Sequence, residues 1–236
     1  ACRGAWIAVL DADDIWHPDR LEKLIEAAAT DVDVMVFDDI MECHNTAKGL
    51  KSWRRLRGRM AFDAKAGMAI DVDPAVWVRC ERLLIKPLIP ATLLRASGVR
   101  HSELQFGADT EFFLKLIAHG MRLRYLPEPY YYYRITPGSM SSLPTRYRLM
   151  RKMLEEITPL FEDVPSMRSS LNIKYEAVRR MENYHQFLAL IRGRHFRDAI
   201  VHTMKYPLVV PELVSRLIND IPYRLHRLLN HGTGRN

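Results

Sequence analysis

Three carboxylates stand within four residues near the start of the chain, in the segment Asp11-Ala12-Asp13-Asp14. They follow the apolar run from Trp6 to Leu10, which has the pattern of a buried parallel strand. Carboxylates this close repel one another unless a positive charge lies among them. Since Mg²⁺ and Mn²⁺ take carboxylates together with substrate phosphates, this strand end is a candidate site for a metal–diphosphate complex. The alternative is a helix N-terminal cap, which needs only one carboxylate.

A further carboxylate, Asp109, stands at the start of the clearest amphipathic helix, which we expect over residues 110–119. Phe112, Phe113, Leu116 and Ile117 give that helix its apolar face. A helix N-terminus favours the charged form of a carboxyl group. The residues alone therefore leave Asp109 as a simple cap or as a group kept ionised for chemistry.

The elements around these residues alternate between strand and helix. The opening is predicted to run from the strand at 6–10 through a helix at 20–29 to a second strand at 34–37, an α/β unit. The later expectations are a basic loop at 48–59, a strand or loop leading to a short helix over 84–100, and strands at 122–126 and 130–134 around a turn at 127–129. From residue 145 the pattern becomes helical, with candidates at 146–161, 167–192, 196–205 and 211–230.

These patterns predict two parts, an α/β part over residues 1–145 and a basic helical region over 146–236. A doubly wound sheet needs more strands ahead of its site than this chain supplies, so we expect a further segment N-terminal to residue 1. Residues 1–145 carry 19 basic and 19 acidic side chains, whereas residues 146–236 carry 16 and 9. This excess suggests an anionic partner for the helical region, and a solvated helix face explains it equally well.

Three blocks of the sequence together resemble the family 2 glycosyltransferases with the GT-A fold. Residues 4–24, GAWIAVLDADDIWHPDRLEKL, resemble the strand, DxD-type turn and Pro-x-Arg-Leu helix start of that family. Residues 106–113 resemble its Gly-Glu-Asp-x-x-Phe segment, and residues 125–141 resemble the strand and loop that close its catalytic domain. The resemblance covers residues 1 to about 142. It implies a GT-A-type, Rossmann-like mixed sheet, incomplete at its N-terminus, with a C-terminal helical region.

The resemblance also implies roles for the acidic residues. Asp13 would bind the metal, Mg²⁺ or Mn²⁺, that holds the diphosphate of a nucleotide-sugar donor. Asp11 would lie near the donor ribose or the metal, and Asp14 would help to position either. Asp109 would be the general base of an inverting, hexosyltransferase-type reaction, accepting the proton of an acceptor hydroxyl. The family usually has Glu before this base, whereas this chain has Ala108.

Arg134, with Ser139 and Ser141, is a candidate for contacts to donor phosphate, because Arg forms paired hydrogen bonds with phosphate oxygens. An ordinary surface loop is the alternative. Tyr130 to Tyr133 are expected to pack on both faces of a strand, with sugar stacking as a lesser option. The Gln-x-x-Arg-Trp motif of processive synthases is absent, which favours a single sugar addition.

The acceptor implied by the resemblance is a glycan or a lipid-linked glycan of the cell surface. The three cysteines are odd in number and widely spaced, which favours a reduced, cytoplasmic setting. Leucines and arginines at helical spacing over 213–228 suggest peripheral contact with the inner face of an anionic membrane, or packing on protein. The basic segment 48–59 lacks the interleaved aromatics of a nucleic-acid surface, so no nucleic-acid partner is expected.

Two other functions remain open from the residues. A haloacid-dehalogenase-type phosphatase also places Asp-x-Asp at a strand end, but Ile15 stands where Thr or Val is usual. A folded remnant without catalytic activity is the second alternative, since part of the nucleotide site would precede residue 1.

Overall fold

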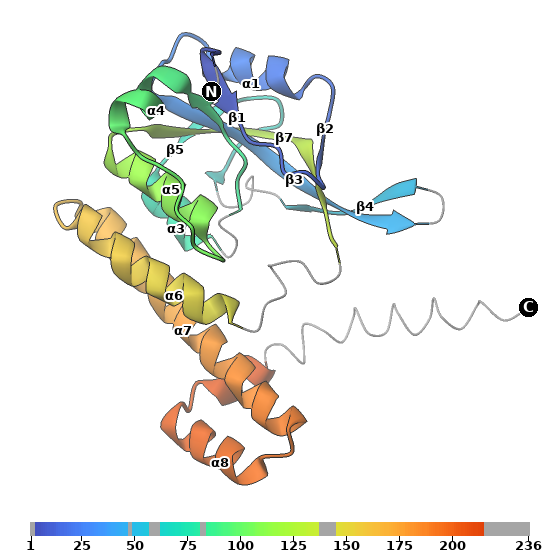
Figure 1. Cartoon of the computed structure of the whole chain (residues 1–236), viewed down its shortest axis with the longest axis vertical. Helices are drawn as coiled ribbons and strands as arrows, with labels where there is room; N and C mark the ends of the chain where they lie inside the picture. Colours follow the sequence, from blue (N-terminus) through green and yellow to red (C-terminus); the bar gives the residue numbers. More distant parts are fainter. Residues whose placement is uncertain (1–2, 47–48, 57–61, 81–83, 137–144, 215–236) are drawn as a thin grey trace, which may run out of the picture. The chain divides into compact units, whose positions relative to one another are not determined.

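The computed structural model describes the chain over five segments, residues 3–46, 49–56, 62–80, 84–136 and 145–214. The chain divides into two compact units, residues 1–175 and 176–236, and the boundary falls within one long helix. The first unit holds the sheet (Figure 1). By their residue numbers, the acidic residues singled out above belong to this unit as well.

The described residues form one seven-stranded mixed sheet in the order β1-β6-β3-β7-β2, with β4 paired to β3 and β5 paired to β7. The two 13-residue strands β3 and β7 are parallel neighbours at its centre. The strand bounds are β1 Trp6–Ala8, β2 Ile15–Trp16, β3 Val34–Thr46, β4 Gly49–Leu56, β5 Ile70–Val72, β6 Leu88–Pro90 and β7 Arg122–Arg134.

The start of β3 is buried on both faces, as its unbroken apolar run predicts. Val34 and Val36 lie in one cluster with Leu24 and Ala28 of helix α1. Phe37 points to the opposite face, because side chains alternate along a strand, and its ring packs edge-on against Phe62 and at a tilt against Tyr125. The centre of the sheet is therefore packed on both faces.

The helices follow the sequence pattern closely. Their bounds are α1 Arg20–Ala28, α3 Pro74–Arg79, α4 Ala91–Ser97, α5 Ala108–Ala118, α6 Arg146–Ile157, the 3₁₀ helix η2 Thr158–Phe161, α7 Pro165–Arg192 and α8 Phe196–Lys205. The predicted α/β class, with a mixed sheet and a helical region after it, is confirmed. Most of the helix expected at 211–230 lies outside the described residues.

Three predictions about strands are wrong. β1 pairs antiparallel with β6 and is half-buried rather than a buried parallel strand. The predicted turn at 127–129 lies inside the continuous strand β7, where the pairing with β3 shifts register and so accommodates prolines that lack an N–H. Most of the expected basic loop is β4, which forms a hairpin with β3.

Charge explains why the basic segment forms a strand. Arg54 pairs with Glu42 at 2.8 Å, and Arg55 pairs with Asp39 at 2.7 Å, both across the hairpin to β3. The two carboxylates are buried, so each arginine neutralises a charge that would otherwise be costly. These arginines serve the fold of the sheet.

Candidate functional site

One buried ammonium group joins two of the acidic residues that the sequence singles out. Nζ of Lys86 lies 2.7 Å from Oδ2 of Asp11 and 2.7 Å from Oδ2 of Asp109. The Lys86 side chain is 3% exposed, whereas each carboxylate is 39% exposed. Two carboxylates that are 98 residues apart in the sequence thus share one buried ammonium group, and each stays partly exposed to solvent.

Three adjacent elements bring these groups together. Asp11 follows β1, Lys86 precedes β6, and these two strands are hydrogen-bonded neighbours. Asp109 is the second residue of α5, whose N-cap is Gly107 with φ of 87°. The alternative that Asp109 is a simple cap is therefore wrong, since the helix already begins at Ala108.

The charge on Asp109 reflects its two basic neighbours. Burial alone would raise the pKa of Asp109, but the Lys86 ammonium and then the His101 ring hold this pKa below its usual value. Nε2 of His101 lies 2.9 Å from Oδ1 of Asp109. Burial alone would lower the pKa of Lys86, but Asp109 and Asp11 raise it. Asp109 is therefore ionised at neutral pH, and Lys86 is protonated.

Asp14 is turned away from this open position and into the protein. Its carboxylate accepts a hydrogen bond of 2.7 Å from the Tyr131 hydroxyl and one of 2.8 Å from the main-chain N–H of Arg134. Burial raises the pKa of Asp14 above its usual value despite these two bonds. Asp14 thus fixes the acidic turn against β7, and both of its oxygens are already engaged.

A second buried cation, the Arg20 guanidinium, contacts the elements around the acidic turn. Arg20, at the start of α1, is fully buried and forms an ion pair of 2.8 Å with Asp38 of β3. Its guanidinium also donates to the main-chain oxygen of Lys86 and lies over the rings of Trp16 and Tyr131, at 5.0 and 4.9 Å from their centroids. Arg20 therefore ties α1, β3, β7 and the segment before β6 into one network.

Asp13 stands at the exposed tip of the turn, and the described part of the chain gives it no hydrogen bond or ion pair. Among the described residues, no three His, Cys, Asp or Glu side chains come together as a ready metal site. The donor set here is Asp13 with its neighbour Asp11. That set fits a cation such as Mg²⁺, which binds through one or two carboxylates and takes its other ligands from substrate phosphates and water.

Arg134, the predicted phosphate ligand, ends β7 beside the acidic turn through the main-chain bond to Asp14. Its side-chain Nε is buried and has no hydrogen-bond partner within the described segments. Ser139 and Ser141 lie outside the described residues. Of the four consecutive tyrosines, Tyr131 contributes its hydroxyl to the site, and the main-chain N–H of Tyr130 donates to Asp38.

Sequence reasoning missed Lys86 and His101. Lys86 stands between Ile85 and Pro87 in an apolar stretch, and a lysine there that is not on a polar helix face must find a carboxylate. The apolar neighbours of Lys86 could thus have drawn attention to it in the sequence, but they do not identify the carboxylates that it contacts. His101 lies in an irregular segment whose position near Asp109 depends on the fold alone.

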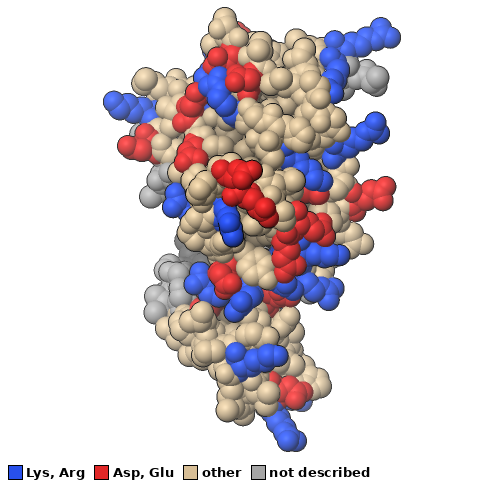
Figure 2. All heavy atoms as spheres, turned by 90° about the vertical axis from the view of Figure 1, so that its left-hand side faces the viewer, with Lys and Arg blue, Asp and Glu red and all other residues tan. Residues whose placement is uncertain are grey.

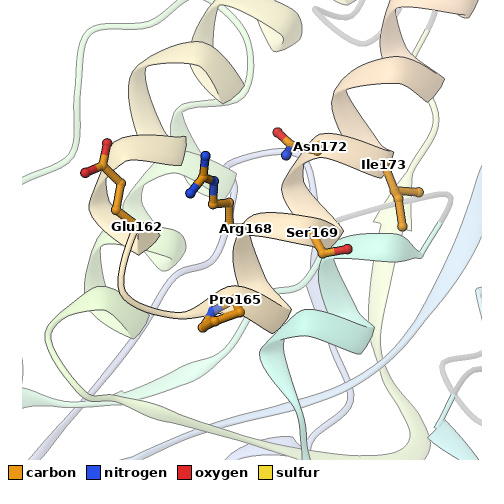
Figure 3. A pocket seen from close by; sticks show the side chains of 6 residues that line it. All are labelled: Glu162, Pro165, Arg168, Ser169, Asn172 and Ile173. Atoms are coloured by element: carbon orange, nitrogen blue, oxygen red, sulfur yellow. The ribbon is translucent and has the colours of Figure 1, made fainter.

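Two surface hollows in the first unit are lined by other residues. One, of about 410 Å³, lies at the start of α7 between Glu162 and Ile173, where Arg168, Ser169 and Asn172 line it (Figure 3). The other, of about 460 Å³, is mostly apolar and lies beside β5, the end of α5 and η2. On the face of the molecule in Figure 2, acidic and basic side chains are interspersed among uncharged ones. Neither of the two hollows is lined by Asp11, Lys86 or Asp109.

Comparisons with known proteins give the site a context. Residues 1–80 match the model of the family described as Glycosyl transferase family 2. The chain is 26% identical to the succinoglycan biosynthesis protein ExoO of Rhizobium meliloti (strain 1021) over 97% of its own length, and 23% identical to ExoU of the same organism over 91%. It spans 65% and 64% of the length of those two proteins.

A crystal structure of S. aureus TarS matches 79% of this chain and 29% of that one, with a TM-score of 0.46 and 14% identity. That likeness is too distant to support an argument about the site. The family match covers β1, the acidic turn, α1, β3 and the supporting pair of Arg20 and Asp38. The chain is thus similar to family 2 of the glycosyltransferases over residues 1–80, the part that carries the acidic turn.

Proposed function

We propose that the chain carries the catalytic centre of an inverting glycosyltransferase that moves a sugar from a nucleotide-diphosphate donor to a hydroxyl acceptor. One observation carries the proposal. The Lys86 ammonium group contacts Asp11, which is two residues from Asp13, and also contacts Asp109. The acidic turn and an ionised carboxylate thus meet at one ammonium group, and both stay partly exposed to solvent.

Asp13, with Asp11 beside it, would hold the divalent cation that arrives with the donor diphosphate. The cation would neutralise the charge that builds up on the departing diphosphate. Asp11 is held at 2.7 Å by Lys86, so it would approach the donor ribose or the cation from a fixed direction. Asp14 is committed to Tyr131 and Arg134, and we assign it to shaping the turn.

Asp109 would act as the general base. The acceptor hydroxyl would give its proton to the Asp109 carboxylate while its oxygen forms a bond to the anomeric carbon. The bond from that carbon to the diphosphate would break, and its electron pair would leave on the diphosphate oxygen. Attack from the face opposite the leaving group inverts the anomeric centre. A positioned carboxylate of this kind typically contributes a factor of about 10²–10⁴ in rate.

We infer that the acceptor is a glycan or a lipid-linked glycan and that the chain acts in polysaccharide synthesis. The two R. meliloti relatives are named as succinoglycan biosynthesis proteins. We place the protein in the cytoplasm or at the inner face of the membrane. The match to a glycosyltransferase family over the acidic turn argues against the phosphatase alternative.

Calorimetric titration with UDP and Mn²⁺ tests the donor site. We expect the wild-type chain to bind UDP only when Mn²⁺ is present, and Asp13→Ala to abolish that binding. Asp163→Ala is the matched control, because Asp163 is also exposed but lies in the helical region. Further titrations with the other nucleoside diphosphates extend the test beyond uridine. If no nucleoside diphosphate binds, the remnant alternative is correct; hydrolysis of an aryl phosphate that Asp11→Asn abolishes would support the phosphatase.

A further inference from the structure

Helix α8 exposes its apolar side. Phe196, Ile200, Val201 and Met204 are between 58% and 79% exposed. The opposite side of the helix packs inward, where Ala199 is buried and His202 contacts the main-chain oxygen of Asn183 at 2.9 Å. A surface helix of a globular protein normally shows the reverse arrangement, with its apolar side against the core.

The exposed apolar residues continue beyond the end of α8. Leu208, Val210 and Val214 are between 48% and 57% exposed. We call the whole set the α8 surface, made of Phe196, Ile200, Val201, Met204, Leu208, Val210 and Val214. Single exposed apolar residues are common, but four on one side of a ten-residue helix form a patch of the kind that binds a partner, and the other three extend the exposed apolar set to residue 214.

The charges around this patch indicate its partner. At about 100° per residue, Arg197 projects between Met204 and Val201, inside the apolar arc of α8. Lys205 and Asp198 lie at one edge of the arc, so no carboxylate lies within it. Within the described residues 176–214, six side chains are basic and four are acidic. A basic amphipathic helix of this pattern suits an anionic bilayer, where arginine and lysine reach the headgroups while apolar side chains enter the acyl boundary.

A second copy of the chain suits the patch less well. Packing one α8 arc against another would bury two copies of Arg197 with no carboxylate in either arc, which costs free energy.

None of the helices within the described ranges is long and apolar enough to cross a membrane. At ten residues, α8 is about 15 Å long, a length suited to lying along the surface.

We propose that the α8 surface docks on an anionic lipid bilayer with α8 lying in the membrane–water interface. This proposal deepens the proposed function, on which it rests for its purpose, because it names the surface on which the chain would meet a lipid-linked acceptor. The docking itself requires neither donor nor metal. Its test can therefore fail or succeed separately from the test of UDP binding.

Flotation of the full chain with lipid vesicles tests the docking. One set of vesicles contains phosphatidylcholine alone, and the other contains phosphatidylcholine mixed with phosphatidylglycerol. We expect binding to the mixed vesicles that is at least about tenfold tighter than binding to the neutral ones and that weakens at high salt. We expect the double variant Ile200→Gln/Met204→Gln to lose at least about tenfold in binding to the mixed vesicles, since two apolar anchors no longer enter the lipid.

Leu160→Gln/Ile173→Gln is the matched control, because both residues are about half exposed and lie in the first unit. Circular dichroism checks that both double variants keep their helices. The proposal is overturned if the wild-type chain does not float with mixed vesicles, or if the control loses as much binding as the α8 variant. It is also overturned if the α8 variant changes only a monomer–dimer equilibrium in sedimentation, which would make the patch a contact between copies.

Discussion

Replacing Lys86 with methionine removes the charge that Asp11 and Asp109 share while keeping a side chain of similar length. The wild-type ammonium is 3% exposed and contacts both carboxylates at 2.7 Å. Breaking a fully buried ion pair by removing one partner costs about 3–5 kcal/mol. Because each carboxylate is 39% exposed, water screens part of this cost, and we expect a loss of about 2 kcal/mol in the free energy of unfolding at pH 7.

The loss should depend on pH in a defined direction. In the wild type the pKa of Asp109 is lowered, so its stabilising contribution is present above the unfolded-state pKa and is lost as the pH falls through the folded-state pKa. In Lys86→Met, only the His101 ring still opposes the effect of burial, so the pKa of that carboxyl group rises relative to wild type. The variant is then least stable, relative to wild type, at neutral pH. The difference shrinks as the pH falls below the ordinary aspartate value of 3.8, where Asp109 becomes protonated in the wild type as well.

Urea unfolding at several pH values measures this difference, and Lys23→Met is the control. Lys23 pairs with Glu26 at 2.8 Å, but both side chains are exposed, so its loss should lower the free energy of unfolding far less than the loss of Lys86. The reasoning is refuted if Lys86→Met and Lys23→Met unfold with the same free energy at pH 7, or if the cost of Lys86→Met does not change between pH 7 and a pH below 3.8.

Three other substitutions test the remaining parts of the site. Asp109→Asn should lower the rate of sugar transfer about 100-fold or more while UDP binding measured by calorimetry stays unchanged, since the base does not hold the donor. Arg20→Leu should lower the free energy of unfolding in urea by about 3–5 kcal/mol, because it leaves Asp38 buried and unpaired. A wild-type urea midpoint in that variant would contradict the network. Tyr131→Phe should cost about 1–2 kcal/mol in the same assay through the lost hydrogen bond to Asp14, and an unchanged midpoint would show that this bond is not stabilising.

The sequence was most informative where one local pattern sufficed. α1, α5 and α8 lie within one or two residues of their expected ranges, because periodic apolar faces define helices without reference to the rest of the chain. The interruption expected at 127–129 failed for the opposite reason. The pairing of β7 with β3 continues on both sides of that segment. The register shift leaves residues 127–130 of β7 opposite Asp39 alone, so neither proline occupies a paired position.

The site could be predicted as a set of acidic residues but not as an arrangement. Asp11, Asp13 and Asp109 were identified from their types and from the family resemblance, and their roles stay predictions. Asp14 is buried while Asp13 stays exposed, because Asp14 accepts hydrogen bonds from Tyr131 and from the end of β7. No sequence pattern near the acidic turn reveals this difference. The contacts of Lys86 likewise depend on the fold, because β1 and β6 must pair before its ammonium group lies beside Asp11.

The hydrogen bonds that Asp14 accepts from residues 131 and 134 also determine how late in synthesis the acidic turn can take its final shape. The acidic turn leaves the ribosome more than a hundred residues before the strand that shapes it. Contacts so distant in sequence form late, because a long loop must close first. A nascent chain that stops short of the tyrosine run would thus expose the apolar edge of β3 and lack a shaped donor turn, and it would depend on chaperones until β7 is complete.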